Sequence, residues 1–164
     1  MAIINIKSKE RKPAALLFFM FFSIVSATIT GASVRDAVFL TQFDKSYLPV
    51  MFITIAVVMA GVIALYKKLT AGQDQIFVIS ISGALFSVSL FLLQSNLSGL
   101  FIPVLYIWME VVTILSIFQF WILAGEVFNA RQAKRIFTLM GAGGSFAGMG
   151  AGYGIKPFVS TFGS

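Results

Sequence analysis

Long apolar stretches separated by short polar segments make up most of the chain. A helix needs about 20 apolar residues to cross the roughly 30 Å hydrocarbon core of a bilayer. The sequence predicts five such spans, at residues 14–34, 47–66, 75–94, 100–124 and 136–155. A basic segment, residues 1–13, precedes this helical domain (14–155), and a tail, residues 156–164, follows it. The pattern predicts an all-α membrane protein with about five transmembrane helices, the fifth ending at Lys156–Pro157.

The composition excludes several kinds of chemistry. Hydrophobic residues make up 59% of the 164 residues and charged residues 11%, whereas soluble domains average about 25% charged residues. The chain has no cysteine and no histidine, which removes disulfides, thiolate nucleophiles, Cys/His metal sites and histidine acid–base catalysis. Its six acidic residues are scattered along the sequence. We therefore predict that the protein is not an enzyme and has neither a metal site nor a cofactor.

Lysine and arginine are distributed unevenly between the two sides of the predicted spans. With the N-terminus in the cytoplasm, nine of the twelve basic residues fall on the cytoplasmic side, as the positive-inside rule requires. We therefore predict that residues 1–13 are cytoplasmic. The net charge of +6 comes from short clusters between apolar stretches, which favours a lipid bilayer over nucleic acid as the partner.

Glu110 is the most costly residue to place in a membrane. It lies ten residues into the fourth span, about 15 Å deep, where a charged side chain costs about 2.5–3.5 kcal/mol. Tyr106 and Thr113 lie on the same helical face, at helical spacings of four and three residues. Two interpretations remain open: a protonated carboxyl bonded to a neighbouring helix, or a functional acid that faces a cavity. Under the second, Tyr106, Glu110 and Thr113 belong to a substrate-binding face.

The charged pair Arg35–Asp36 follows the first span directly. It belongs either to a solvated loop or to a one-turn extension of the first helix, in which Asp36 would be a gating charge or part of a charge pair. Four hydroxyl residues lie on one face of that helix, which indicates either close packing or a water-lined path. They are Ser23, Ser26, Thr30 and Ser33.

Small and charged residues mark the last part of the chain. Seven of the fourteen glycines lie in the fifth span, and Gly144, Gly148 and Gly152 are four residues apart, a spacing typical of helices that approach a neighbour closely. Before that span lie four charged residues, Glu126, Arg131, Lys134 and Arg135. They form ion pairs or bind lipid headgroups at the cytoplasmic surface, or alternatively they contact an incoming anion.

Three segments resemble the plastid and bacterial ATP/ADP translocases, a nucleotide-transporter family related to the major facilitator superfamily. The segments are SVRDAVFLTQF (33–43), YIWMEVVTILSIFQFWILAGEVF (106–128) and NARQAKRIFTLMGAGGS (129–145). The resemblance implies a divergent bacterial member in the inner membrane. It also implies that the chain corresponds to most of the N-terminal half of a two-half transporter, whose remaining helices are its partners, with residues 156–164 as the truncation point.

The resemblance assigns roles to two residues. The family's lysine at the end of the first helix falls on Arg35, and its glutamate in the fourth helix falls on Glu110. Because arginine presents a planar fork that suits phosphate, this exchange is not neutral. The implied function is secondary transport of an anionic, nucleotide-type solute, by exchange or symport. The alternative is a non-transporting membrane scaffold or assembly subunit, in which Glu110 and the glycines serve packing.

Overall fold

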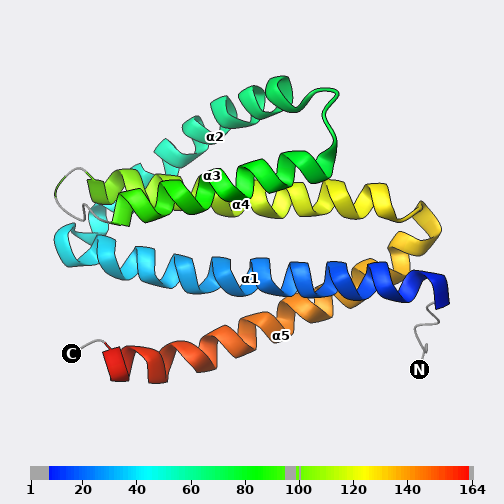
Figure 1. Ribbon diagram of the computed structural model, residues 1–164. Coiled ribbons are helices and arrows are strands. Elements are labelled where there is room, and N and C mark those ends of the chain that lie inside the picture. The colour runs from blue at the N-terminus through cyan, green and yellow to red at the C-terminus, as the bar shows by residue number, and fades with distance from the viewer. Residues whose placement is uncertain (1–7, 95–98, 100, 163–164) are drawn as a thin grey trace. The chain divides into compact units, whose positions relative to one another are not determined.

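The computed structural model describes residues 8–94, 99 and 101–162. These residues form five α-helices and one short 3-10 helix, with no strand among them. In chain order the elements are α1 (Ser8–Gln42), η1 (Lys45–Tyr47), α2 (Leu48–Thr70), α3 (Gln75–Gln94), α4 (Phe101–Val127) and α5 (Ala130–Phe162) (Figure 1). The predicted all-α fold is confirmed.

Four stretches of the described chain are long and apolar enough to cross a membrane. They are Glu10–Gln42, Lys45–Thr70, Gln75–Leu93 and Phe101–Val127, and they identify an integral membrane protein of the all-α class. The predicted fifth span is not among the four in the described residues. The reason lies in the composition of α5, because its many glycines contribute little hydropathy.

The first helix is longer than the apolar pattern indicates. α1 continues beyond Val34 to Gln42, so Arg35 and Asp36 lie inside a helix and not in a solvated loop. The apolar residues 37–40 continue the span after the charged pair, which explains the extension. Asp44 then begins η1, because its carboxylate accepts a hydrogen bond of 2.9 Å from the Ser46 backbone N–H.

The connection between α4 and α5 is shorter than the sequence indicates. Only Phe128 and Asn129 separate the two helices. Asn129 and Gln132 form a capping box, in which the Asn129 side chain accepts from the Gln132 N–H at 3.2 Å and the Gln132 side chain accepts from the Asn129 N–H at 3.1 Å. This reciprocal pair fixes the start of α5.

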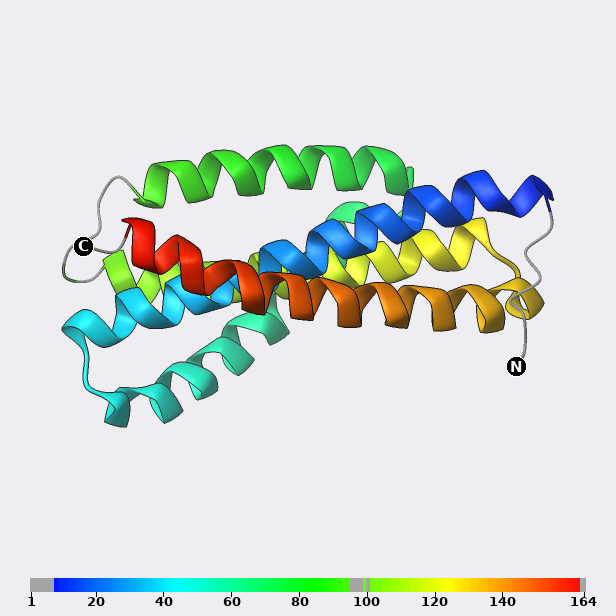
Figure 2. The ribbon, with the colours of Figure 1, turned by 90° about the horizontal axis from the view of Figure 1, so that it is seen from below.

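The predicted end of the last helix is wrong. α5 continues past Lys156 and Pro157 to Phe162 (Figure 2). A proline removes one intrahelical hydrogen bond, but helices of membrane proteins tolerate proline more readily than soluble ones do.

Residue contacts divide the chain into two compact units. The first consists of the described residues up to Thr30 and from Phe120 onward, and the second of Gly31–Gln119. α1 and α4 therefore contribute residues to both units. We describe each unit by itself.

The first unit packs α5 against the N-terminal part of α1 and the end of α4. Its buried core is Ala14, Leu17, Phe120, Ala124, Phe128, Ile136 and Met140. Glycines permit the close approach of α5 to α1: a Cβ atom on Gly143 would lie 2.6 Å from the Phe18 ring, and one on Gly144 would lie 3.2 Å from the Phe21 ring. Of the predicted glycine stripe, Gly144 and Gly148 lie near α1, whereas Gly152 has open space beside it.

The second unit combines α2 and α3 with the remaining parts of α1 and α4. Its buried core comes from α1, α2 and α4 and consists of Phe39, Met51, Ile55, Met59, Ile102, Tyr106, Val111 and Leu115. Two side-chain hydrogen bonds join α3 to α4, from Trp108 Nε1 to Ser89 Oγ at 2.7 Å and from Ser82 Oγ to Gln119 Oε1 at 3.0 Å.

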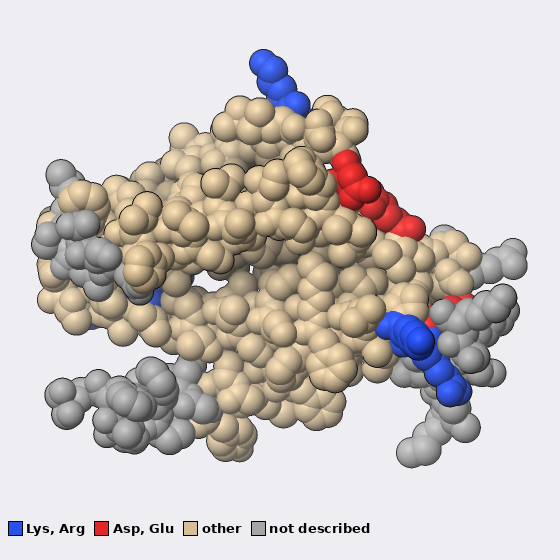
Figure 3. Space-filling view, viewed as in Figure 1, with Lys and Arg blue, Asp and Glu red and all other residues tan. Residues whose placement is uncertain are grey.

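Charged side chains are sparse on the face in Figure 3, as contact with lipid requires.

Candidate functional site: an ion-pair cluster of α1 and α4

Three charged side chains meet inside the second unit. The Arg35 guanidinium contacts one Asp36 oxygen through Nε and Nη2, each at 2.9 Å, and it donates through Nη1 to the Glu110 carboxylate. The Arg35 side chain is 9% exposed, whereas that of Glu110 is 29% and that of Asp36 is 49% exposed. A buried guanidinium is therefore shared between a carboxylate on its own helix and one on α4.

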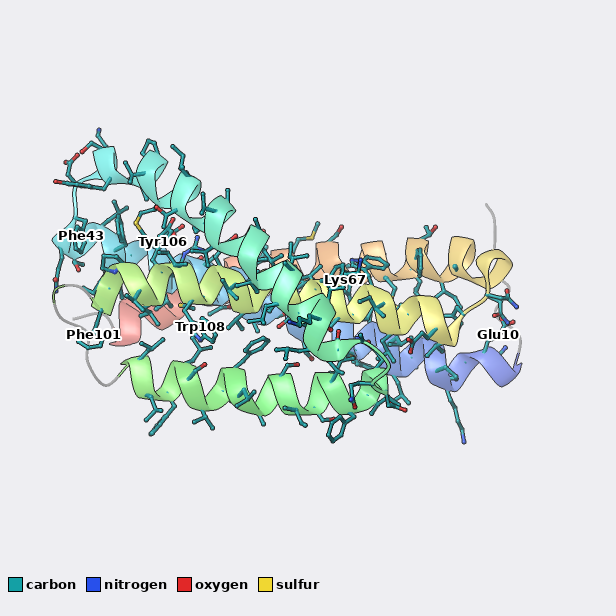
Figure 4. All side chains as sticks on the ribbon, turned by 90° about the horizontal axis from the view of Figure 1, so that it is seen from above. Glu10, Phe43, Lys67, Phe101, Tyr106 and Trp108 are labelled. Atoms are coloured by element: carbon teal, nitrogen blue, oxygen red, sulfur yellow. The ribbon has the colours of Figure 1, made fainter. Side chains whose placement is uncertain are left out.

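Aromatic side chains cover one face of the guanidinium. The ring of Tyr106, which is 1% exposed, lies with its centroid 4.2 Å from the Arg35 guanidinium carbon. The Phe39 ring lies 4.9 Å from the Tyr106 ring and is stacked at 5.0 Å on Phe43. Figure 4 shows Phe43 and Tyr106 close together in the unit. A cation over a desolvated ring gains up to about 2 kcal/mol, so the rings stabilise the charge that the carboxylates neutralise.

Helical spacing explains why these side chains converge. Arg35 and Phe39 are four residues apart on α1, and Tyr106 and Glu110 are four residues apart on α4, so each helix presents one charged and one aromatic side chain on one face. One turn before Arg35, Gly31 allows α4 to approach, because a Cβ atom there would lie 3.1 Å from the Met109 side chain. The site therefore depends on a close contact between two helices.

The charge balance of the cluster determines what it can bind. With one guanidinium and two carboxylates, its net charge is −1 when all three groups are ionised. A guanidinium has five N–H donors, and three are used here. An anion that binds Arg35 must therefore take the two remaining donors or displace a carboxylate. Asp36 and Glu110 are both partly exposed, so either can move away.

The structure brings four of the predicted site residues together and leaves a fifth, Thr113, apart from them. Arg35, Asp36, Glu110 and Tyr106 lie together, as a shared site requires. Thr113 is half-buried on α4, but within the described part of the chain its hydroxyl makes no hydrogen bond to this cluster. The proximity of Arg35 and Glu110 was predicted only as a shared substrate role, and their direct pairing was not.

The predicted charge cluster at the start of α5 stays a prediction. Glu126 is exposed in the last turn of α4. Arg131, Lys134 and Arg135 lie on helical backbone in the first turns of α5, but their side chains lie outside the described residues. In this region the structure describes a different contact, from the Gln132 amide to Glu10 Oε1 at 2.8 Å.

The sequence analysis did not predict the two hydrogen bonds that join α3 to α4, Trp108–Ser89 and Ser82–Gln119. Ser82, Ser89 and Gln119 are isolated polar residues in apolar helices, and such residues are typical partners across transmembrane helices. Their presence was a usable signal, although the sequence alone does not say which of them pair. Together the two bonds orient α3 on α4.

Comparison with known proteins identifies no family for this chain. No family model, no curated protein and no solved structure matches it. Within the described residues, no three His, Cys, Asp or Glu side chains form a set that could hold a metal ion. A functional assignment therefore depends on the geometry of the Arg35 cluster.

Proposed function

We propose that the chain is a helical segment of a secondary transporter for an anionic, nucleotide-type solute. The observation that carries this proposal is the Arg35–Glu110 ion pair, which joins two helices that are both long and apolar enough to span a membrane. Charged residues within membrane helices are costly, and they mark substrate paths, proton relays or voltage sensors more often than they serve packing.

The mechanism follows from competition for one guanidinium. A phosphate group of the solute offers two oxygens to Arg35 in the bidentate geometry that arginine favours. It therefore takes donors that Glu110 or Asp36 occupies in its absence. When Glu110 is displaced, the tie between α1 and α4 opens, and the solute thereby changes the packing of the two helices. Such a coupling of solute binding to helix packing is what alternating access needs.

The topology belongs to the same proposal. The N-terminus lies in the cytoplasm, because this orientation puts most lysines and arginines inside, and the membrane is the bacterial inner membrane, as the resemblance to the ATP/ADP translocases implies. The binding site is completed by further helices of the transporter. The partners are the bilayer and the nucleotide-type solute.

Uptake of radiolabelled ATP, ADP and phosphate by cells that express the uninterrupted parent gene tests the proposal. We expect saturable uptake of nucleotide that Glu110→Gln abolishes, with expression and membrane insertion unchanged. Asp44→Asn is the control, since it removes an exposed carboxylate outside the predicted site and keeps an acceptor for the Ser46 N–H, and it leaves uptake intact. No nucleotide uptake by a well-inserted protein, or equal loss in both variants, would contradict the proposal.

A second function is favoured by one specific observation. Three of the five guanidinium donors are already used within the chain, as in a structural tie. The chain would then be a non-transporting membrane scaffold or assembly subunit. Under this alternative, Glu110→Gln affects only the stability of the protein, and no solute competes for Arg35.

A further inference from the structure

The two carboxylates of the Arg35 cluster differ in which edge of the guanidinium they hold. Asp36 accepts from Nε and Nη2, each at 2.9 Å, and these two nitrogens form the side edge of the group. Glu110 accepts from Nη1, which forms the outer edge together with Nη2. A bidentate anion binds both nitrogens of one edge. It therefore takes the outer edge and displaces Glu110, whereas Asp36 keeps Nε and stays paired.

Glu110 has no second cation to replace Arg35. Within the described residues, its ion pair is with Arg35 alone. From α4 itself, the Tyr106 ring lies over the guanidinium, and α3 carries no charged residue. The other charged side chains of the second unit are exposed and lie at or near helix ends; they are Asp44, Lys45, Lys67, Lys68 and Asp74. Displacement by an anion therefore leaves an unpaired carboxylate inside an apolar helix.

The charge of a displaced Glu110 carboxylate is unfavourable for two reasons. Its side chain is 29% exposed and lies about 14 Å from the start of α4, where hydrocarbon does not stabilise a charge. The bound phosphate lies beside it, and a neighbouring like charge disfavours the ionised form of a carboxyl group. A proton from water that binds one carboxylate oxygen removes both costs, because it converts Glu110 to the neutral acid.

We propose that Glu110 takes up one proton when the solute anion binds Arg35, so that the anion and the proton are carried together. This inference rests on the proposed transport function, and it assigns proton symport as the mode of transport. In the empty site the Glu110 carboxylate pairs with Arg35. In the loaded site the phosphate pairs with Arg35 and Glu110 is the neutral acid. When the anion leaves, Arg35 returns to Glu110, whose proton passes back to water. Binding of the anion and binding of the proton therefore strengthen each other.

Proton uptake on ATP binding tests the proposal. The complete transporter that contains this chain is purified in detergent, and ATP is added in weak buffer with a pH-indicator dye at about pH 7.5, where the terminal phosphate of ATP has lost its protons. We expect uptake of about one proton for each ATP bound. Because a proton binds with the anion, the affinity for ATP should also fall about tenfold for each unit of rising pH.

Glu110→Gln is the test variant, because its amide imitates the neutral acid. We expect this variant to bind ATP without proton uptake and with an affinity that no longer depends on pH. Asp44→Asn is the matched control, since it removes an exposed carboxylate outside the cluster and keeps an acceptor for the Ser46 N–H, and it retains the uptake of one proton.

The possible failures are distinguishable. Binding of ATP by the native transporter without proton uptake overturns this inference and leaves the proposed function standing. Proton uptake that persists in Glu110→Gln overturns the assignment of the proton to Glu110. No binding of ATP overturns the proposed function and this inference with it.

Discussion

Arg35 and Glu110 should contribute unequally to stability, although they form one ion pair. Arg35→Met leaves two carboxylates without a cation inside the second unit. Removing one partner of a buried pair costs about 3–5 kcal/mol, and the partial exposure of both carboxylates places the expected loss near 3 kcal/mol. In Glu110→Gln, Asp36 still neutralises Arg35 and the new amide oxygen still accepts from Nη1. We therefore expect a loss of about 1 kcal/mol, the difference between a charged and a neutral hydrogen bond.

The free energy of unfolding, measured by circular dichroism during titration of the detergent-solubilised protein with a denaturing detergent, tests this asymmetry. Glu126→Gln serves as the control and should change the free energy by less than about 0.5 kcal/mol, because Glu126 is exposed. The reasoning is refuted if Glu110→Gln costs as much as Arg35→Met. That result would mean that Asp36 does not share the guanidinium.

Two further predictions concern other parts of the chain. Gly143→Ala should destabilise the protein by about 1–3 kcal/mol, because the new Cβ atom would lie 2.6 Å from the Phe18 ring. The control Gly141→Ala, with open space at its Cβ position, should stabilise the helix by up to about 1 kcal/mol. Equal effects of the two substitutions on thermal unfolding would contradict the packing of α5 on α1. Hydrogen bonds from Ser46 lower the pKa of Asp44 from its ordinary value, so its ionised form stabilises η1 above the unfolded-state pKa of about 3.9, and this contribution is lost as the pH falls through the folded-state pKa. An NMR titration in which Asp44 ionises at or above the ordinary value would contradict this.

The helices could largely be predicted because hydrocarbon thickness sets their length. The third span was predicted at residues 75–94, and α3 occupies Gln75–Gln94. The end of the first helix could not be predicted from the local pattern. A charged pair ends an apolar stretch in the sequence, but the partner that makes it tolerable inside a helix is Glu110, 75 residues further along the chain.

The candidate site was predictable in its members but not in its connections. Glu110 was identifiable because an acid within an apolar span is costly, and Tyr106 because it lies one turn away. Thr113 satisfies the same spacing, yet nothing in the described residues joins it to Arg35. Periodicity gives the face of one helix, whereas the pairing across helices depends on tertiary packing, here on the close approach at Gly31.

The central claim is that the Arg35 guanidinium passes from carboxylates to a solute anion. Equilibrium binding of radiolabelled ATP to the complete transporter that contains this chain, in lipid nanodiscs, tests this claim most directly. Arg35→Lys keeps the charge but loses the bidentate geometry. We predict that this change weakens binding tenfold or more, roughly the 1.5–3 kcal/mol of a charged hydrogen bond. The control Lys45→Arg, outside the cluster, leaves affinity unchanged. Equal affinity in Arg35→Lys and the native protein, or no binding by the native protein, would contradict the account.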